Sequence, residues 1–356
     1  MPEEIQAFFF FRLILIFDAV SFFRIFNIME NKFADLHDIF RTKMSYVITS
    51  HVNPDGDAIG SEVALARFLT ALGKHVTIVN QSETPEHLLF LTRVFPVYSF
   101  SGVFNKTIKE CECIIVVDTN SPKRFTALAD AILHSPAYKI CIDHHLEQEP
   151  FADMYVIDTE VPATCELLYH IINYYNPNSI TNQIADALYT GIMTDTASFR
   201  FPKTDSETHS IVANLLSRGV DPYKIYQQVF ENGPINKLWL LGKALASIQL
   251  HHGGKVAAMI LPRDLFKETR TNESDVDNFT SYVLSIKNVA IGLVFVEQID
   301  SVKVSFRSKG NVSVNELAKQ FEGGGHKNAA GANLKKTSLK KAIEKVLEAA
   351  KPFVQA

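Results

Sequence analysis

The chain has few cysteines, and they lack the spacings of a redox motif. Cys111, Cys113, Cys141 and Cys165 include one C-x-C pair but no C-x-x-C pair. Three of the four lie in or beside apolar runs, which predicts buried thiols. The pattern argues against a disulfide scaffold and favours a reducing cytoplasm.

An excess of positive charge is also absent. The 356 residues have a formal net charge of −4 at pH 7. This charge argues against a broad basic surface for long nucleic acid, but it allows a small phosphorylated ligand held by a few local cations. We found no internal repeat and no low-complexity tract. A chain of this length suits two domains.

The apolar N-terminal segment, residues 1–28, lacks the uninterrupted run that a membrane span needs. Arg12, Asp18 and Arg24 interrupt it. The acidic start, MPEEIQ, is not typical of a secretory signal. The segment is interpreted as a peripheral helix, a membrane anchor or an extension outside the natural chain. We favour the last interpretation, with Met29 as the start, and expect no stable membrane partner.

Short apolar runs alternate with helix-like segments in the first part of the chain. The runs are SYVITS, HVTIVN, CIIVVDTN, YKICIDHH and YVID. This alternation predicts an α/β domain over 29–222, with a parallel sheet covered by helices on both faces. A helical linker is expected over 223–250. A smaller α+β domain with antiparallel strands around QIDS is expected over 251–356.

Carboxylate and imidazole side chains follow the predicted strands at the points where these end. Ligands of an open parallel sheet bind outside the carboxyl ends of its strands, so these side chains are expected to meet at one edge. Three strands and one helix contribute to the set. Its members are His51, Asp55, Asp57, Asp118, Asp143, His144, His145 and Asp195.

So many carboxylates in one place predict a metal centre. They cannot all be ionised in a low-dielectric pocket without a compensating positive charge. A mixed carboxylate and imidazole set without thiolate favours Mn²⁺, Co²⁺, Fe²⁺ or Mg²⁺ over structural zinc. Two ions about 3.5–4 Å apart, bridged by one aspartate, would use the whole set and would activate water for phosphate ester hydrolysis.

Each motif alone has a simpler interpretation. An aspartate after a strand is usually a helix cap or a turn former, and D-H-H can be a solvated turn. The metal hypothesis depends on the motifs occurring together, in this order, each at the end of an element.

The motifs resemble those of the DHH phosphoesterases. HVNPDGDAIGS, VVDTN, IDHH and GIMTDTASFRF are similar to the four metal motifs of that family. SFRSKGNVSVNELAKQFEGGGHKNAAGA resembles the DHHA1 domain of the branch with oligoribonuclease and phosphoadenosine phosphate phosphatase activity. The resemblance extends from about residue 31 to the end. One departure is Ala197, where the family often has glycine before the serine of the fourth motif.

This resemblance implies two divalent ions, most simply Mn²⁺, with Co²⁺ or Mg²⁺ as alternatives. Asp118 would bridge them. The first ion would also contact His51 and Asp55. The remaining ligands of the second ion would be Asp57, His144 and Asp195.

The resemblance also implies roles for the two residues on either side of His144. His145 would lie near the scissile phosphate as an acid or a hydrogen-bond donor to the leaving oxygen. Asp143 would orient this motif without binding metal directly.

A glycine-rich motif in the second domain is a candidate substrate site. Gly323, Gly324 and Gly325 would let backbone amides approach an anion, and His326 follows at once. A flexible turn is the simpler interpretation, with NAAGA beginning a helix-like or tight segment. The resemblance places Arg307 and this motif on a phosphate or on the nucleotide beyond the scissile bond.

Three further cations follow the metal motifs. Lys123, Arg124 and Arg200 are candidates for contacting substrate, although surface ion pairs are an equally good interpretation. Phe199 and Phe201 could stack a base, but alternation on a strand favours core packing.

The predicted function is hydrolysis of RNA of two to five nucleotides and removal of the 3′-phosphate of phosphoadenosine phosphate. A short RNA has few phosphates and can be bound by a few cationic side chains, which agrees with the acidic net charge of the chain. The alternatives are a phosphodiesterase of linear or cyclic dinucleotides and, less favoured, an inorganic pyrophosphatase. A regulator with a decayed site is disfavoured because no ligand position is substituted. A homodimer is allowed.

Overall fold

The computed structural model describes residues 29, 31–93, 95–146, 148–276 and 279–354. The expectations for residues 1–28 therefore lie outside the described residues. The chain divides into two compact units between Asn232 and Gly233, inside the range 223–250 taken above as a linker. Among the described residues, no helix is both long and apolar enough to cross a membrane.

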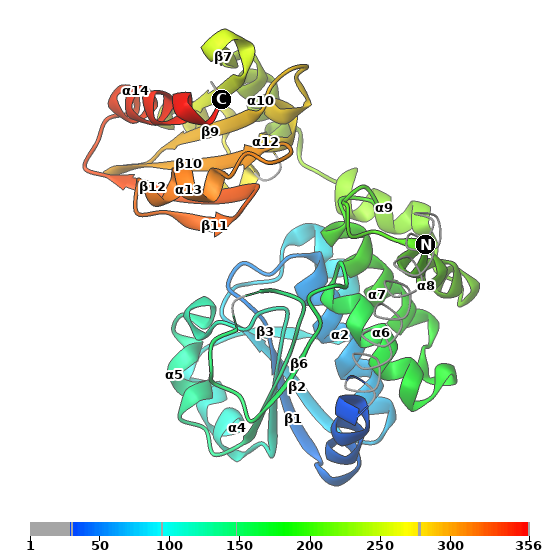
Figure 1. Ribbon diagram of the computed structural model, residues 1–356. Coiled ribbons are helices and arrows are strands. Elements are labelled where there is room, and N and C mark those ends of the chain that lie inside the picture. Colours follow the sequence, from blue (N-terminus) through cyan, green and yellow to red (C-terminus); the bar gives the residue numbers. More distant parts are fainter. Residues whose placement is uncertain (1–28, 30, 94, 147, 277–278, 355–356) are drawn as a thin grey trace, which may run out of the picture. The chain divides into compact units, whose positions relative to one another are not determined.

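The first unit is built on a six-stranded parallel sheet, which confirms the predicted fold class (Figure 1). Its strand order is β3-β2-β1-β4-β5-β6, so the direction of strand addition reverses between β1 and β4. The strands are β1 (Ser45–Thr49), β2 (His75–Asn80), β3 (Val97–Ser99), β4 (Cys113–Val117), β5 (Tyr138–Asp143) and β6 (Met154–Ile157).

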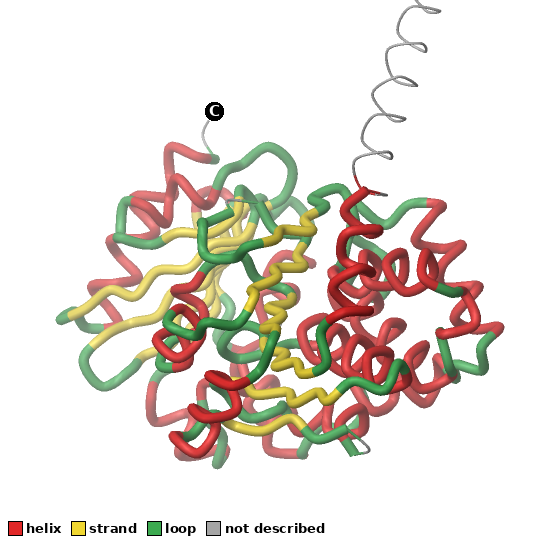
Figure 2. Tube along the Cα trace, turned by 90° about the horizontal axis from the view of Figure 1, so that it is seen from below, coloured by secondary structure: helices red, strands yellow, loops and turns green. Residues whose placement is uncertain are grey.

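Helices cover both faces of this sheet, as predicted (Figures 1 and 2). Successive residues of a strand point to opposite faces. In β1, Ile48 packs into the core on one face and Val47 into the core on the other. Helices α2 (Gly56–Ala71), α6 (Thr164–Tyr175) and α7 (Asn182–Asp195) contribute to the first core, and α4 (Asn105–Glu110) and α5 (Leu128–Leu133) to the second.

Helices α2 and α6 approach α7 closely because α2 and α7 carry glycine at the contacts. A Cβ atom on Gly60 of α2 would lie 2.5 Å from the carbonyl oxygen of Ala187 in α7. A Cβ atom on Gly191 of α7 would lie 2.2 Å from the Sγ of Cys165 in α6. No side chain fits at either contact, so these glycines bring the N-terminal ends of α2 and α6 next to α7.

The second unit is an α+β domain, as predicted, and its sheet is mixed. Its order is β11-β12-β10-β9-β8-β7, with β8 and β9 parallel and the other neighbours antiparallel. The strands are β7 (Gln249–His251), β8 (Val256–Leu261), β9 (Ile291–Glu297), β10 (Ser301–Ser308), β11 (Gly324–His326) and β12 (Ala329–Lys335).

Helices flank this second sheet on both faces as well. Helices α10 (Ile235–Ala246), α11 (Arg263–Thr269) and α12 (Phe279–Ser285) share a core with one face of β8 and β9. The opposite face of these strands packs with α13 (Val314–Lys319) and α14 (Leu339–Ala350).

Two local predictions are wrong. NAAGA is not helical: Ala329 begins β12, whose alternate residues Ala330 and Ala332 are buried. Phe199 and Phe201 do not lie on a strand. They belong to the turn after α7, in which Phe199 packs against the core and Phe201 is exposed.

The helices on either side of the division expose large apolar side chains. Tyr223, Tyr226 and Phe230 are exposed on α9 (Pro222–Phe230). On α10, Leu238 is exposed, and so is Trp239, with 56% of its surface accessible.

Candidate metal centre

The predicted acids and imidazoles of the first unit gather where the strand order reverses. His51, Asp55 and Asp57 follow β1, and Asp118 follows β4, the strand beside it. Asp143 ends β5, the next strand along. The crevice at such a reversal is where open parallel sheets bind ligands.

Two of these carboxylates belong to the start of α2. Asp55 is the N-cap residue, and its Oδ1 accepts hydrogen bonds from the amides of Asp57 (3.0 Å) and Ala58 (3.1 Å). These two hydrogen bonds satisfy backbone amides at the start of α2 that have no partner within the helix. They also fix Oδ1 of Asp55 and leave Oδ2 facing the imidazole of His51 at 4.0 Å.

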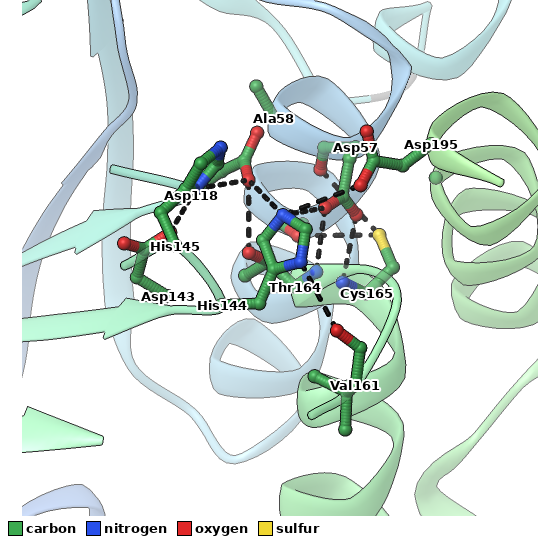
Figure 3. A network of polar contacts seen from close by, with 12 residues as sticks. Asp57, Ala58, Asp118, Asp143, His144, His145, Val161, Thr164, Cys165 and Asp195 are labelled. Carbon is green, nitrogen blue, oxygen red and sulfur yellow. Dashed lines mark hydrogen bonds and ion pairs between the residues drawn. The ribbon is translucent and has the colours of Figure 1, made fainter. Parts of the chain in front are cut away.

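Asp57 interacts with a second helix, α6 (Figure 3). Its Oδ2 accepts a hydrogen bond from the Thr164 amide at 2.6 Å, and its Oδ1 accepts one from the Cys165 amide at 2.9 Å. These are the first two amides of α6, whose own N-cap residue, Ala163, has no side-chain acceptor. The buried carboxylate of Asp57 therefore caps α6 from a distant part of the sequence.

Asp118 adopts an unusual backbone conformation at the end of β4. Its φ angle is +59°, in the left-handed region, and its amide donates to the carbonyl of Ile142 at 3.0 Å. The Thr164 hydroxyl donates to its Oδ1 at 3.0 Å. Only 2% of its surface is exposed, so the strained residue is held by neighbours on all sides.

Two histidines present the same ring atom to these carboxylates. Nδ1 of His51 bonds to the carbonyl of Val52 (2.9 Å), and Nδ1 of His144 bonds to that of Val161 (3.3 Å). A carbonyl oxygen can only accept a hydrogen bond, so Nδ1 of each neutral ring carries the proton. Each Nε2 therefore keeps a lone pair that can bind a metal. Carbonyl support of this kind is typical of histidines that bind metal.

The candidate ligands lie close to both Nε2 atoms. Figure 3 shows His144 with Asp118 and Asp195 around it. Nε2 of His51 is 3.4 Å from Oδ2 of Asp118. Nε2 of His144 is 3.7 Å from Oδ1 of Asp118 and 3.4 Å from Oδ2 of Asp195. The donor atoms form three groups that could hold an ion: His51, Asp55 and Asp118; Asp57, His144 and Asp195; and Asp118, His144 and His145.

The electrostatics of this cluster favour a bound cation. Burial and the neighbouring acids raise the pKa of Asp57 to about 6 and that of Asp195 to about 7. The same two causes raise the pKa of Asp118 well above its ordinary value. Burial lowers the pKa of His51 and of His144, so neither ring supplies a positive charge. A divalent ion would allow the acids to ionise, and the donor set suits one.

His145 lies beside this cluster, on the exposed side. Its Nδ1 is 2.7 Å from Oδ1 of Asp143 and 3.8 Å from Oδ1 of Asp118. Burial alone would lower the pKa of His145, but the hydrogen bond and the charge of Asp143 raise it above its ordinary value. Asp143 thus favours a protonated ring at His145.

The three predicted cations of this unit differ in their surroundings. The positive charge of Arg124 disfavours protonation of both His51 and His145; it adds to the effect of burial at His51 and partly opposes Asp143 at His145, so its guanidinium lies near the cluster. Lys123 instead pairs with Glu149 at 3.2 Å. Arg200 is exposed and its Nε donates to the carbonyl of Ala197 at 2.8 Å.

The remaining predicted site residues lie in the second unit. Arg307 is half-buried on β10, its guanidinium donates to the carbonyl of Phe306 at 3.1 Å, and burial lowers its pKa. His326 is exposed on β11. Gly324 and Gly325 also lie on β11, so this part of the glycine motif forms a strand.

The two domains match two family models. Residues 45–192 match the DHH family N-terminal domain, and residues 253–356 match the DHHA1 domain. A bifunctional oligoribonuclease and PAP phosphatase NrnA of Thermus thermophilus is 33% identical over 302 residues, which cover 85% of this chain and 88% of the relative. The chain belongs to the DHH/DHHA1 phosphoesterases.

Other DHH proteins extend this comparison. The crystal structure of an exopolyphosphatase-related protein from Bacteroides fragilis is 31% identical, with a TM-score of 0.87, and the match covers 92% of this chain and 98% of that one. A cyclic-di-AMP phosphodiesterase PdeA of Listeria monocytogenes is 24% identical over 88% of this chain and 48% of its own length. DHH proteins use divalent metals, and the clusters described above are consistent with such a centre.

Sequence reasoning missed one segment of this DHH centre, residues 161–165. The Val161 carbonyl supports His144, the Thr164 hydroxyl bonds to Asp118, and the amides of Thr164 and Cys165 bond to Asp57. Most of these contacts use backbone atoms, which leave no trace in the residue types. The available signal was a threonine at the start of the next helix after β6.

Proposed function

We propose that this DHH phosphoesterase hydrolyses RNA of two to five nucleotides to mononucleotides and removes the 3′-phosphate of phosphoadenosine phosphate. The observation that carries the proposal is the gathering of buried aspartates and histidines at the reversal of the parallel sheet. The relative with these two activities named supports the choice of substrates. The four cysteines are free and buried, which supports action in the cytoplasm.

In this proposal Asp118 would be a ligand of two divalent ions, with Mn²⁺ preferred and Co²⁺ or Mg²⁺ as alternatives. The first would be held by His51, Asp55 and Asp118, which form one of the groups described above. Bound there, the pair would lower the pKa of a water molecule and neutralise phosphoryl oxygens. The second ion's ligands would be Asp57, Asp118, His144 and Asp195.

His145 is the proposed proton donor to the leaving oxygen. Asp143 holds Nδ1, so Nε2–H is the acid of a protonated ring. As an oxygen from water forms its bond to phosphorus, the bond between phosphorus and the ribose 3′-oxygen breaks, and this leaving oxygen takes the proton from Nε2. Arg124, whose charge reaches both His51 and His145, would pair with a phosphate oxygen of the substrate.

The second unit supplies a proposed nucleotide site of its own. Arg307 on β10 and His326 on β11 both pair with Ala329 of β12, so the three lie in one row across the sheet. Side chains of directly opposed residues share a face. Two residues along, on the same face, Gly324 pairs with Gly331, and a Cβ on Gly324 would meet nothing within 4 Å. An arginine and a histidine beside bare backbone suit a phosphate and its nucleoside.

A second candidate function is hydrolysis of linear or cyclic dinucleotides. The relative named as a cyclic-di-AMP phosphodiesterase, which matches most of this chain, favours it. Such a substrate offers the same phosphodiester to the same centre.

A comparison of substrates tests the proposal. The full chain with Mn²⁺ is incubated with a labelled diribonucleotide, phosphoadenosine phosphate, cyclic di-AMP and pyrophosphate. We expect release of mononucleotide from the first and of orthophosphate from the second. Faster turnover of cyclic di-AMP would favour the second candidate, and release from pyrophosphate alone would overturn both.

A further inference from the structure

Asn120 connects the segment after β4 to the segment that carries His145. Only 4% of its surface is exposed. Its Nδ2 donates to the carbonyl of His145 at 2.9 Å and to that of Leu146 at 3.4 Å. Its own carbonyl accepts a hydrogen bond from the amide of Glu149 at 3.1 Å. One buried residue therefore bonds to three points of the neighbouring segment.

A second tether joins the same two segments nearer to the solvent. The hydroxyl of Ser121 and the ammonium of Lys123 both donate to Oε1 of Glu149, at 2.8 and 3.2 Å. The carboxylate of Glu149 is 38% exposed, so this contact is weaker than a buried one. It holds the segment four residues beyond His145 and does not touch the histidine itself.

His145 is thus held at two places. Asp143 bonds to its ring, and Asn120 bonds to its carbonyl. The hydrogen bond to the ring fixes the rotation of the imidazole, whereas the hydrogen bond to the carbonyl fixes the position of the backbone of His145. Proton transfer needs both, since a displacement of about 1 Å in a reacting group can cost roughly 10²-fold in rate.

We propose that Asn120 is a positioning residue that sets His145 for protonation of the leaving group. This inference rests on the role given to His145 in the proposed function. It assigns no contact with substrate or metal to Asn120. Its action is on the rate of one step, the breaking of the bond between phosphorus and the leaving oxygen.

Two esters that differ only in the acidity of the leaving group test this assignment. The probes are the phenyl and p-nitrophenyl esters of thymidine 5′-monophosphate. Nitrophenolate leaves without a proton, whereas phenolate depends on one. The variants are Asn120→Leu, which keeps the branched shape without a donor, and Asn120→Asp, which keeps the shape and replaces the donor by an acceptor. Ser121→Ala is the matched control, because it weakens only the outer tether.

We expect kcat for the phenyl ester to fall by about 10- to 100-fold in both Asn120 variants. The p-nitrophenyl ester should be hydrolysed within about threefold of the wild-type rate, with KM and bound manganese unchanged. Ser121→Ala should retain both activities. In a His145→Ala background, Asn120→Leu should have no further effect on the phenyl ester.

Several outcomes would overturn the inference. Equal losses on the two esters would show that Asn120 only maintains the fold, and loss of manganese would show that it supports the metal ligands. Unchanged activity of the Asn120 variants on both esters would show that Asn120 does not position His145. A wild-type protein that hydrolyses both esters but no diribonucleotide would refute the proposed RNA substrate, while the ratio of the two ester rates would still decide the role of Asn120.

Discussion

Asp118 is the residue on which both proposed ions depend. Its carboxylate lies 3.4 Å from Nε2 of His51 through one oxygen and 3.7 Å from Nε2 of His144 through the other. The residue type and its place after a strand could be predicted from the sequence. The left-handed backbone that turns it towards both histidines could not, because φ depends on the bond from its amide to Ile142.

Asp118→Asn should therefore remove metal and activity together. The amide keeps the shape but offers a neutral oxygen, so we expect bound manganese to fall and turnover to drop by at least about 100-fold. Metal content after dialysis and hydrolysis of a diribonucleotide measure the two effects. Asp130→Asn, at an exposed position on α5, is the control. Full manganese content with full turnover would contradict the bridging role.

A second prediction concerns Glu62, a buried residue of α2 that binds no proposed ion. Its Oε2 accepts from Asn80 at 2.9 Å, and burial raises its pKa from 4.5 to about 8. Between these values the folded protein holds a proton that the unfolded chain has released. The free energy of unfolding therefore falls as pH rises through this interval.

Glu62→Gln should remove this contribution. We expect the melting temperature of the variant, relative to that of the wild type, to increase between pH 5 and pH 8, with a relative increase of several degrees at pH 8. Thermal unfolding at a series of pH values measures the difference. Melting curves that stay parallel across the series would show that Glu62 is ionised in the folded state.

At the scale of elements, the turn after α7 carries three consecutive non-glycine residues in the left-handed region. The φ angles are +49° at Ala197, +59° at Ser198 and +65° at Phe199. Side chains other than glycine are strained there, by roughly 1–2 kcal/mol each. This conformation favours glycine at each of the three positions. The turn directly follows Asp195.

Ala197→Gly should relieve part of this strain. We expect stabilisation by roughly 1 kcal/mol, with unchanged metal content, measured by urea unfolding. Ala131→Gly, inside α5, is the matched control and should destabilise by about 0.5–1 kcal/mol. A destabilising effect of both substitutions on the free energy of unfolding would show that the turn is not strained at Ala197.

Element types followed from the apolar patterns wherever packing agrees with local preference. The runs CIIVV and YKICID predicted β4 and β5, because parallel strands are buried on both faces. The glycine motif was different. Gly325 forms part of a strand because its backbone lies against β12, where a Cβ would come within 2.4 Å of the carbonyl of Ala329. That contact is tertiary, so glycine alone predicts only a loop.

At the scale of the whole molecule, the sequence predicted that these side chains gather at one edge of a parallel sheet, but it did not predict the strand order that brings them together. The meeting depends on the strand order, which places β1 beside β4 and β4 beside β5. Apolar runs carry no record of this order. The net charge of −4, in contrast, follows directly from the sequence, and it bears on how the reaction rate depends on salt.

We expect hydrolysis of a diribonucleotide to depend weakly on salt. A diribonucleotide makes few phosphate contacts and so releases few counterions, and kcat/KM should change by less than about tenfold between about 50 and 200 mM salt. Steady-state kinetics at several salt concentrations, with manganese held constant, measure the slope. A steep slope, of the size seen for proteins that contact many phosphates, would indicate an extended RNA surface.

Trp239 is the single tryptophan of the chain, and it is exposed on α10. Its indole emission therefore originates from one known place, and no labelling is required to observe it. Titration of nucleotide into the protein, followed by the shift and quenching of this fluorescence, would report on events at α10 in real time, independently of any turnover assay.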